Sequence, residues 1–585
     1  MKKKRGLIFL LIALMLSACG NINNAPIGDT ETNVHMNSET TPALTATPVA
    51  PTAIPTPTQP ITLKVYSQLC SWSGEQQGWF AKVLLDKFNV KLYYMTENNT
   101  QEPLEEAADL IIFGNTGDYY KECVEQGLLL DWEANDLLAE HGAYILENMP
   151  KALEHNRSLT PQVNKIFGFG QGAVPSADVC EDFFYTWDIR WDLYKELGYP
   201  QVQDLEELVS VFEDMKALCP TDENGEETYA MSLWPDWDQN MMLIAKCMAT
   251  AYYGYDEHGL GLYDTKTGTF YGALEENGPY LEMLRFFNTL YRKDLLDPDS
   301  RTQTFEDMLN KLRCSGVFFS VFNYAGSMEY NTKEHMTQNK YMAGLLPEEA
   351  SPAAYGLSVY GGIRPWTIGA NTQYPELCME LINWLCTPEG RMTFEYGPQG
   401  MFWDYDEERN TYFTELGKTW MVERVVQVPE EYGGGYFNDG AFQLNNITWS
   451  SYAPNPDSNG ECYNHQSWKS NTSAPCCPME EDWREYIGAL TANEYIKSKN
   501  YVVIPATHYE AAEKGENLEA VWEQVAERIV KGSWDAIYAE SEEAFERIVS
   551  EMITEAKKLG YEECVAWCNY EAVRRHKLEE ALWEE

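Results

Sequence analysis

Hydrophobic positions in the first part of the chain alternate with polar ones as they do in β-strands. In the segment 61–66 every second residue is apolar, which predicts a strand. The segment 90–95 predicts a second strand, and a helix is expected between the two, from about residue 77 to 88. The uninterrupted apolar run 110–113 is typical of a buried strand in a parallel sheet.

Later segments show the period of a helix. In 205–218 the apolar residues form one stripe at helical spacing and the acidic residues lie elsewhere on the cylinder. The segment 544–559 has the same pattern and is followed by Gly560, which is typical of a helix C-terminus. The segments 228–233 and 317–322 predict further strands. This alternation of strands and helices favours an α/β fold.

The N-terminus has the pattern of an export signal. Basic residues at 2–5 precede an apolar run at 7–16, which is too short to span a bilayer but has the length of a signal-peptide core. Small residues and then Cys19 follow, as in a bacterial lipobox, where the cysteine is acylated and becomes the new N-terminus. We therefore expect a lipoprotein signal peptide at 1–18 and a lipid anchor on Cys19. The alternative is an ordinary secretory signal that contains a cysteine.

The next segment, 19–60, is expected to be a tether. From residue 41 to 60 threonine, proline and alanine dominate, and such a stretch favours extended polyproline II conformation. The folded part then begins near residue 61 and is about 525 residues long, enough for two or more lobes.

The charge of the chain excludes some partners. The formal net charge is -48 at pH 7. A surface this acidic repels phosphate backbones, so we expect no nucleic-acid partner. Solubility outside the cell is the simplest reason for the acidity.

Cysteine spacing indicates neither a metal site nor a clear disulfide pattern. Thirteen cysteines besides Cys19 would suggest disulfides in an exported protein, but several fall in helical apolar patterns, where free thiols pack well. One hypothesis is a bond from Cys462 to Cys476 or Cys477. The acidic segment 222–226 lacks the ligand spacing of a calcium loop and predicts a turn. We expect no metal and no cofactor.

Motifs of enzymes are missing from the sequence. The chain has only 8 histidines, and it lacks a His-Glu-x-x-His arrangement, a Gly-x-Ser-x-Gly elbow, a Walker loop and a dinucleotide fingerprint. Its 91 carboxylates are too many to single out an acid/base pair. The sequence therefore favours a protein that is not an enzyme.

Aromatic residues give a stronger signal. They make up 13% of the chain, with 18 tryptophans and 37 tyrosines. Flat rings stack on the apolar faces of sugars while nearby polar side chains bond the hydroxyls, so this composition suits an uncharged polar ligand. The tryptophans at or near the ends of predicted strands are Trp72, Trp187, Trp234, Trp237, Trp366 and Trp403.

Four segments carry motifs in a fixed order behind the lipobox. They are FYTWDIRWDLYKELG at 184–198, YPELCMELINWLCTPEG at 374–390, GPQGMFWDYD at 397–406 and IVKGSWD at 529–535. Together they resemble the extracellular solute-binding lipoproteins of ABC importers, and most of all the long carbohydrate-type group that includes the LipO-like and aldouronate-importer binding proteins. The first motif departs from the family in the swapped order of Trp191 and Asp192.

This resemblance implies a fold and a function. The fold is α/β, a two-lobed periplasmic-binding-protein-like (type II) fold with a hinge and an interlobe cleft. The implied protein is a monomer, lipid-anchored at the extracellular face of the bacterial cell membrane, that captures an oligosaccharide and delivers it to ABC permease subunits. The expected lobe 1 comprises 61–170 and 345–400, and the expected lobe 2 comprises 171–344 and 401–585.

Site residues follow from strand ends and from the same analogy. A first group on one side of the cleft consists of Trp72, Asn115, Asp118 and Trp366. A second group on the other side consists of Trp187, Arg190, Trp234, Trp237 and Asn323. Trp403 is added because it lies in a family motif, and Arg190 or Arg364 could pair with an acidic sugar. Three alternatives stay open: a binding protein for a non-sugar solute such as a peptide, a secreted glycoside hydrolase, and a surface adhesin.

Overall fold

The structure of the chain is a computed structural model. It describes residues 59–70, 72–96, 107–444 and 446–583. The expected signal peptide, Cys19 and the tether up to residue 58 lie outside these described residues.

The chain divides into two compact units and crosses between them three times. Unit 1 comprises the residues up to Pro175 together with Val359–Ser470, and unit 2 comprises Ser176–Ser358 together with the residues from Asn471 onward. The architecture is mixed α/β in both units, as the sequence predicts. The hinge and the cleft between lobes stay predictions.

The main difference from the expected lobes concerns residues 401–470, which belong to unit 1 and not to unit 2. The reason is aromatic packing. The ring of Phe437 stacks on Trp79 at 5.2 Å, and Phe442 stacks on Phe80 at 4.4 Å. Both partners lie on α2 (Gly78–Phe88), the helix expected at 77–88.

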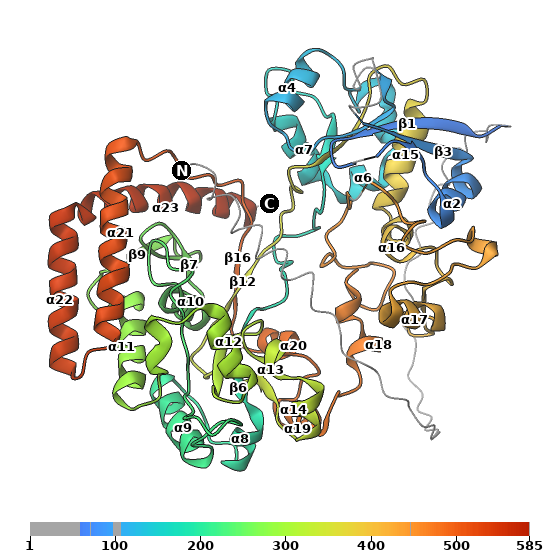
Figure 1. Cartoon of the computed structure of the whole chain (residues 1–585). Coiled ribbons are helices and arrows are strands. Elements are labelled where there is room, and N and C mark those ends of the chain that lie inside the picture. Colours follow the sequence, from blue (N-terminus) through green and yellow to red (C-terminus); the bar gives the residue numbers. More distant parts are fainter. Residues whose placement is uncertain (1–58, 71, 97–106, 445, 584–585) are drawn as a thin grey trace, which may run out of the picture. The chain divides into compact units, whose positions relative to one another are not determined.

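The largest sheet lies in unit 1 and has the strand order β2-β3-β1-β4-β13-β5. Strands β1, β3 and β4 are mutually parallel, whereas β13 enters between β4 and β5 and runs antiparallel to both. Helices α2 and α15 (Pro375–Cys386) pack against the sheet (Figure 1). The strands are β1 (Ile61–Ser67), β2 (Gly74–Glu75), β3 (Val90–Met95), β4 (Leu110–Ile112), β5 (Gly168–Gly170) and β13 (Pro365–Ile368).

The other elements of unit 1 are short and flank this sheet in sequence. The first pass contributes α4 (Asp118–Glu125), η2 (Ala134–Asp136), α5 (Leu137–His141), α6 (Ala143–Asn148) and α7 (Pro150–Ser158). The second pass contributes α16 (Pro388–Tyr396), the hairpin β14 (Trp403–Tyr405) and β15 (Thr411–Phe413), α17 (Glu415–Glu423), η4 (Glu430–Tyr432) and η5 (His465–Ser467), and α18 (Lys469–Thr472) lies where the chain leaves the unit.

Unit 2 is built around the antiparallel sheet β10-β6-β11. Every residue of its central strand β6 is buried, so the sheet is covered on both faces. Two further sheets accompany it, the three-stranded β7-β8-β9 and the parallel pair β12-β16. The strands are β6 (Tyr185–Arg190), β7 (Asp256–Glu257), β8 (Gly261–Asp264), β9 (Thr269–Gly272), β10 (Phe319–Phe322), β11 (Met342–Gly344), β12 (Ala353–Tyr355) and β16 (Val502–Ile504).

Helices of unit 2 begin and end where local chemistry requires it. Helix α9 (Leu205–Leu218) matches the predicted stripe and begins at Asp204, whose carboxylate accepts two backbone N–H groups. The others before β16 are α8 (Trp191–Glu196), α10 (Leu243–Tyr253), α11 (Pro279–Arg292), η3 (Pro298–Arg301), α12 (Phe305–Arg313), α13 (Ser327–Tyr330), α14 (Lys333–Thr337), α19 (Pro478–Ile487) and α20 (Ala492–Lys497).

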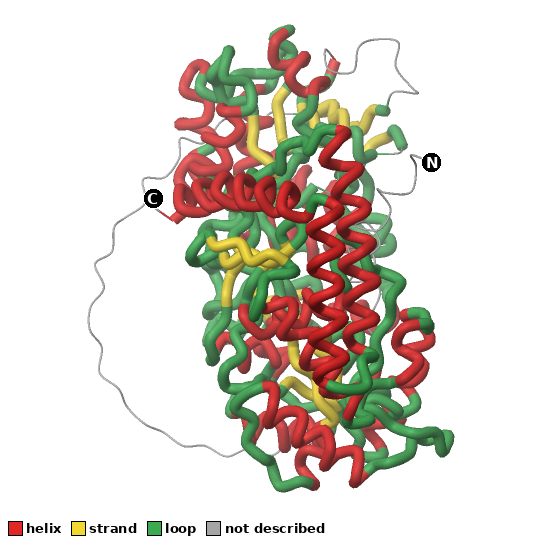
Figure 2. Tube along the Cα trace, turned by 90° about the vertical axis from the view of Figure 1, so that its left-hand side faces the viewer, coloured by secondary structure: helices red, strands yellow, loops and turns green. Residues whose placement is uncertain are grey.

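Three long helices complete unit 2: α21 (Glu516–Ile537), α22 (Glu542–Leu559) and α23 (Tyr561–Trp583). Helices α21 and α22 run side by side (Figure 2). Gly560 ends α22 in the left-handed conformation at φ 107°, which confirms the predicted helix end.

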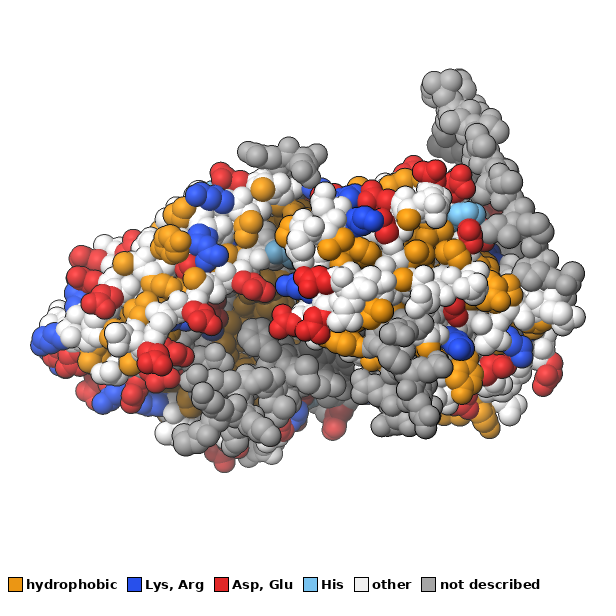
Figure 3. All heavy atoms as spheres, turned by 90° about the horizontal axis from the view of Figure 1, so that it is seen from above, with side chains coloured by type: hydrophobic (Ala, Val, Ile, Leu, Met, Phe, Trp, Pro, Cys, Tyr) orange, Lys and Arg blue, Asp and Glu red, His pale blue; other side chains and the backbone are white. Residues whose placement is uncertain are grey.

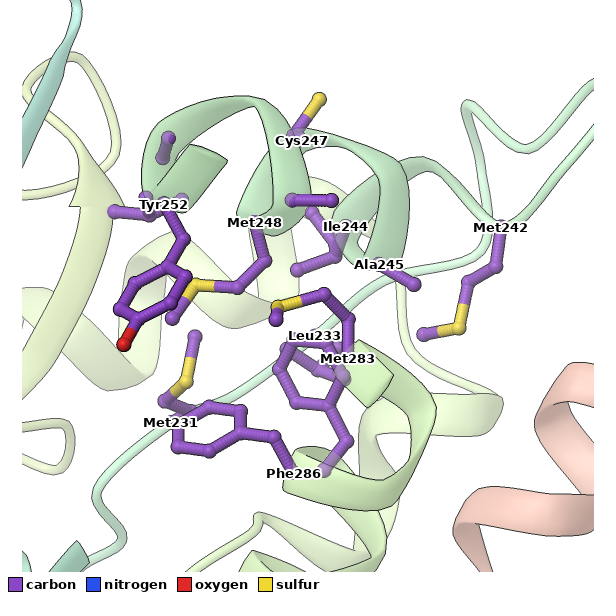
Figure 4. Close-up of a cluster of buried hydrophobic side chains, with 14 of the residues drawn as sticks. Met231, Leu233, Met242, Ile244, Ala245, Cys247, Met248, Tyr252, Met283 and Phe286 are labelled. Atoms are coloured by element: carbon purple, nitrogen blue, oxygen red, sulfur yellow. The ribbon is translucent and has the colours of Figure 1, made fainter. Parts of the chain in front are cut away.

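The core of unit 2 gathers around α10, nearly all of which is buried. In Figure 4, Met248 and Tyr252 of this helix point toward Met283 and Phe286 of α11, whereas Cys247 lies on the other side. Flexible methionine side chains fill such an irregular interior well.

The predicted strand 228–233 is only partly formed, as isolated bridges at Tyr229 and Met231.

All 13 described cysteines are free thiols, so the hypothesised disulfide of Cys462 is not formed. The thiol of Cys462 lies instead 2.8 Å from the hydroxyl of Ser467.

In the part of the chain that the structure describes, every helix is too short or too polar to cross a membrane. In Figure 3, acidic side chains lie scattered among basic and apolar ones.

Candidate ligand-binding site

The carboxyl ends of the parallel strands meet at one edge of the unit 1 sheet. From β1 the chain continues to β3 on one side and then to β4 on the other, so β1 and β4 flank a switch point in the strand order. In open α/β sheets, ligands bind outside the carboxyl ends of the strands at such a point. This edge, which we call the carboxyl edge, is formed by the loops after β1, β4 and β5 and by the residues before β13.

The loop after β1 presents an aromatic ring at this edge. Trp72 is 37% exposed, and its ring packs edge-on against Tyr94 at 5.5 Å. Tyr94 is itself buried and donates to Gln76 Oε1 at 2.8 Å. Burial raises the pKa of Tyr94 well above its usual value, so this support of Trp72 stays uncharged. One face of the indole can therefore stack on a ligand.

The loop after β4 is held by side chains acting on its own backbone. The amide N–H of Gly114 donates to Gln68 Oε1 at 2.7 Å, which joins this loop to the one after β1. The amide of Gly117 donates to Asn115 Oδ1 at 2.8 Å. Asn115 and Asp118 are both exposed, so the amide nitrogen of Asn115 and the carboxylate of Asp118 can reach a ligand.

Next to these loops, Gln171 fixes the residues that precede β13. Its Oε1 accepts the amide of Arg364 at 2.7 Å, and its carbonyl accepts the amide of Gly362 at 2.7 Å. The carbonyl of Arg364 in turn accepts from Asn446 Nδ2 at 3.4 Å. The carboxyl edge thus combines one exposed indole with an amide and a carboxylate side chain, the mixture that suits a polyhydroxylated ligand.

A second aromatic group lies in unit 2, at the end of β10. Trp234 and Trp237 meet edge to face at 5.7 Å, and both rings contact Phe305. Trp237 is half-buried, whereas Trp234 is buried and its Nε1 has no hydrogen-bond partner within the described ranges. Asn323, the first residue after β10, donates to Phe183 O at 3.3 Å and leaves its buried Oδ1 unpaired. The structure thus brings Trp234 and Trp237 into contact, and Asn323 directly follows Phe322, whose ring lies 6.2 Å from that of Trp234.

Trp187 and Arg190, both on β6, are interior residues. Trp187 is fully buried, and its Nε1 donates to Ala251 O at 3.2 Å. Arg190 is 2% exposed and forms two hydrogen bonds with Asp192, at 2.9 and 2.7 Å. Neither residue offers a surface to a ligand, so we do not retain them as site residues.

Trp366 and Trp403 are also buried, so neither ring offers a surface to a ligand in this structure. Trp366 lies inside β13, where its ring faces Phe442 at 6.3 Å. Trp403 donates its Nε1 to Gly397 O at 2.7 Å. Both rings pack in the interior of unit 1.

Sequence reasoning missed Tyr119, which is 40% exposed beside Asp118 at the start of α4. Its ring lies 5.9 Å from that of Phe113, the residue after β4. The sequence does contain a signal for this residue, namely two adjacent tyrosines in the first turn of a helix, of which only Tyr120 faces the core. Tyr120 is indeed buried and accepts from Asn156 Nδ2 at 2.9 Å.

In the part of the chain that the structure describes, no group of three or more His, Cys, Asp and Glu side chains is arranged to hold a metal ion. The segment 222–226 forms the predicted turn, in which Asp222 Oδ1 accepts the amides of Asn224 and Glu226 at 2.7 and 2.9 Å.

Comparison with solved structures gives similar proteins at low identity. The N-glycan transport solute-binding protein NgtS of Streptococcus pneumoniae is 14% identical, with a TM-score of 0.43 over 88% of this chain and 99% of that chain. The ABC-transporter substrate-binding protein FusA of S. pneumoniae, in complex with kestose, gives the same values. A solute-binding protein associated with an HMO-binding ABC transporter of Bifidobacterium longum infantis is 12% identical, with a TM-score of 0.42 and the same coverage. No protein-family model matches the chain, and no curated protein matches it in sequence.

Proposed function

We propose that this chain is the substrate-binding protein of an ABC importer, and that it captures a carbohydrate and delivers it to the permease without altering it. The observation that supports this proposal is the carboxyl edge of unit 1, whose loops after β1 and β4 carry the exposed ring of Trp72 and the exposed polar side chains of Asn115 and Asp118. The solved proteins named above include one that binds kestose, so the proposal agrees with them but does not rest on that likeness.

The place of the protein in the cell belongs to the same proposal. The lipobox pattern supports a lipid anchor on Cys19 that holds the chain at the extracellular face of the membrane, and the Thr/Pro-rich segment would set its distance from the permease. That the chain acts as a monomer is implied by the family resemblance. The four sequence motifs support the carbohydrate-type group, including its LipO-like and aldouronate-importer members.

The experiment that tests the function is a thermal-shift screen of the full chain against a panel of oligosaccharides, with peptides as a second panel. A ligand that binds only the folded state raises the melting temperature by mass action. We expect a shift with at least one oligosaccharide. A shift with peptides alone, or release of cleaved sugar, would contradict the proposal.

With such a ligand in hand, Trp72→Ala is expected to weaken binding by about 10-fold or more, equivalent to about 1.4 kcal/mol, because the stacking face is lost. Titration calorimetry measures the change. Tyr412→Ala is the matched control, since this aromatic residue of unit 1 is similarly exposed, at 36%, but lies on β15 away from the carboxyl edge. Equal affinities of Trp72→Ala and the unsubstituted chain would show that the carboxyl edge is not the ligand site.

A further inference from the structure

The last helix of the chain, α23, leaves one side uncovered. Glu563, Ala566, Tyr570, Val573 and Lys577 follow one another at alternating intervals of three and four residues, so they lie on one side of the helix. All five side chains are exposed, and Tyr570 and Val573 are 64% and 55% exposed although they are large and hydrophobic. We call these five residues the α23 face.

The opposite side of α23 is fixed to unit 2 by interactions that do not use the α23 face. The buried guanidinium of Arg575 donates to Asp256 at 2.8 Å and to Glu579 at 2.8 Å. The hydroxyl of Tyr263 also donates to Glu579, at 2.6 Å. In Figures 1 and 2, α23 crosses α21 and α22 instead of running alongside them. The α23 face therefore belongs to a helix that is held in place without it.

Charge is distributed unevenly along the exposed side of α23. Glu562 and Glu563 lie in its first turn. Within 564–579, all of which the structure describes, every exposed side chain is apolar, neutral or basic: Ala566, Asn569, Tyr570, Val573, Lys577 and Leu578. The helix thus presents an acidic start, an apolar middle and a basic residue beyond it. In a chain with a net charge of -48, this is a stretch of surface that a second acidic protein can approach without carboxylate repulsion.

We propose that the α23 face pairs with the same face of a second copy of this chain, with the two helices antiparallel about a two-fold axis. Glu563 and Lys577 each lie two helical turns, about 10 Å, from Tyr570. When the two Tyr570 rings meet at the axis, Glu563 of each copy lies opposite Lys577 of the partner subunit. Neither charged group has a partner among the described residues of its own chain, so both are available for these two ion pairs.

This pairing is weak and reversible. One helix face is smaller than a standard interface, which buries about 1,600 Å² in total, so we expect a dissociation constant of about 1 µM or above. Chains that carry the proposed anchor on Cys19 share one membrane, which raises their effective concentration and makes a weak contact sufficient. The family resemblance implies a monomer, and the α23 face adds a dimer that forms where the chains are concentrated.

The test is sedimentation equilibrium of the full chain over a range of concentrations on both sides of the expected dissociation constant. The average mass should rise with concentration from that of one chain toward that of two. Lys577→Glu and Glu563→Lys are each expected to weaken the association by at least about 10-fold, because each places like charges opposite one another. The chain that carries both substitutions should associate again, since the two ion pairs form with their signs exchanged.

Two further variants complete the test. Tyr570→Ala removes the apolar centre of the α23 face and should also weaken the association by at least about 10-fold. Lys531→Glu is the matched control, because Lys531 is an exposed lysine of the same unit that lies on α21, outside the α23 face. It makes the same change of charge as Lys577→Glu and should leave the association unchanged. All substituted side chains are exposed, so the melting temperatures of the variants should equal that of the unsubstituted chain.

Three results would overturn the pairing. A single chain at every concentration would show that no second copy binds, and binding to phosphatidylglycerol vesicles that is lost in Lys577→Glu would then assign the α23 face to a membrane. A dimer that persists in Lys577→Glu and Tyr570→Ala would lie on another surface. Failure of the double substitution to restore the dimer would exclude the antiparallel arrangement. Because sugar binding is measured at the carboxyl edge of unit 1, failure of either proposal leaves the other intact.

Discussion

Replacing Arg190 by alanine is expected to lower the free energy of unfolding by about 3–5 kcal/mol, because it leaves the carboxylate of Asp192 without its partner in a poorly hydrated site. Arg190 is 2% exposed and binds both oxygens of Asp192, and its guanidinium lies 5.1 Å from the ring centre of Tyr330. Asp192 is only 16% exposed, so water cannot fully replace the arginine.

Urea unfolding measures this loss, and hydrogen exchange at β6 amides assigns it to unit 2. Arg285→Ala is the matched control in the same unit. Its guanidinium is 44% exposed and pairs with Glu542 and Glu546 at the surface, so the cost should be about 1 kcal/mol or less. If Arg190→Ala kept the stability of the unsubstituted chain and lost ligand binding instead, the sequence-based assignment of Arg190 to the ligand site would be restored.

Arg391→Ala is expected to have an effect of similar size, about 3–5 kcal/mol, but in unit 1. The side chain of Arg391 is fully buried on α16. Its Nε donates to Trp449 O at 2.9 Å, its Nη1 lies 2.6 Å from Glu395, and its guanidinium stacks on Tyr463 at 5.2 Å. Truncation would leave a buried carbonyl and a carboxylate unpaired and would open a cavity.

This second variant also tests the division of the chain, because Trp449 and Tyr463 lie in the segment that sequence analysis assigned to the other lobe. Hydrogen exchange should rise in 446–470 together with α16, while unit 2 stays protected. Arg409→Ala, at an exposed arginine of unit 1 that donates to Asp457 O at 2.8 Å, is the control and should cost about 1 kcal/mol or less. Increased exchange in unit 2 instead would contradict the described packing.

Strongly periodic segments were predicted well because burial on one face leaves a direct trace in the sequence. The strands at 61–67 and 90–95 and the helices α9 and α22 have bounds close to the expected ones. The segment 228–233 was predicted as a strand and forms only isolated bridges, since its β-like composition reflects burial rather than a continuous ladder.

Prediction of the site was partial for a related reason. Trp72, Asn115 and Asp118 could be assigned to one edge because the loops that follow parallel strands lie at the same edge of a sheet. This rule depends only on the topology of the sheet. Residue type at a strand end does not reveal which way a ring faces, and Trp187 is the clearest case. Its φ of 56° is unusual for a tryptophan, and its indole points into the core of unit 2, which no pattern in the sequence indicates.

The insertion of β13 between β4 and β5 has a consequence for biosynthesis. Strand β5 is bonded in its sheet only to β13, which is translated almost 200 residues later, after most of unit 2. A nascent chain that ends before Pro365 must therefore keep the flank of β4 uncovered, and an uncovered flank invites association with other chains. Maturation of unit 1 has to wait until the ribosome has passed the first segment of unit 2, Ser176–Ser358. Premature termination would therefore yield an aggregation-prone fragment rather than an independent half.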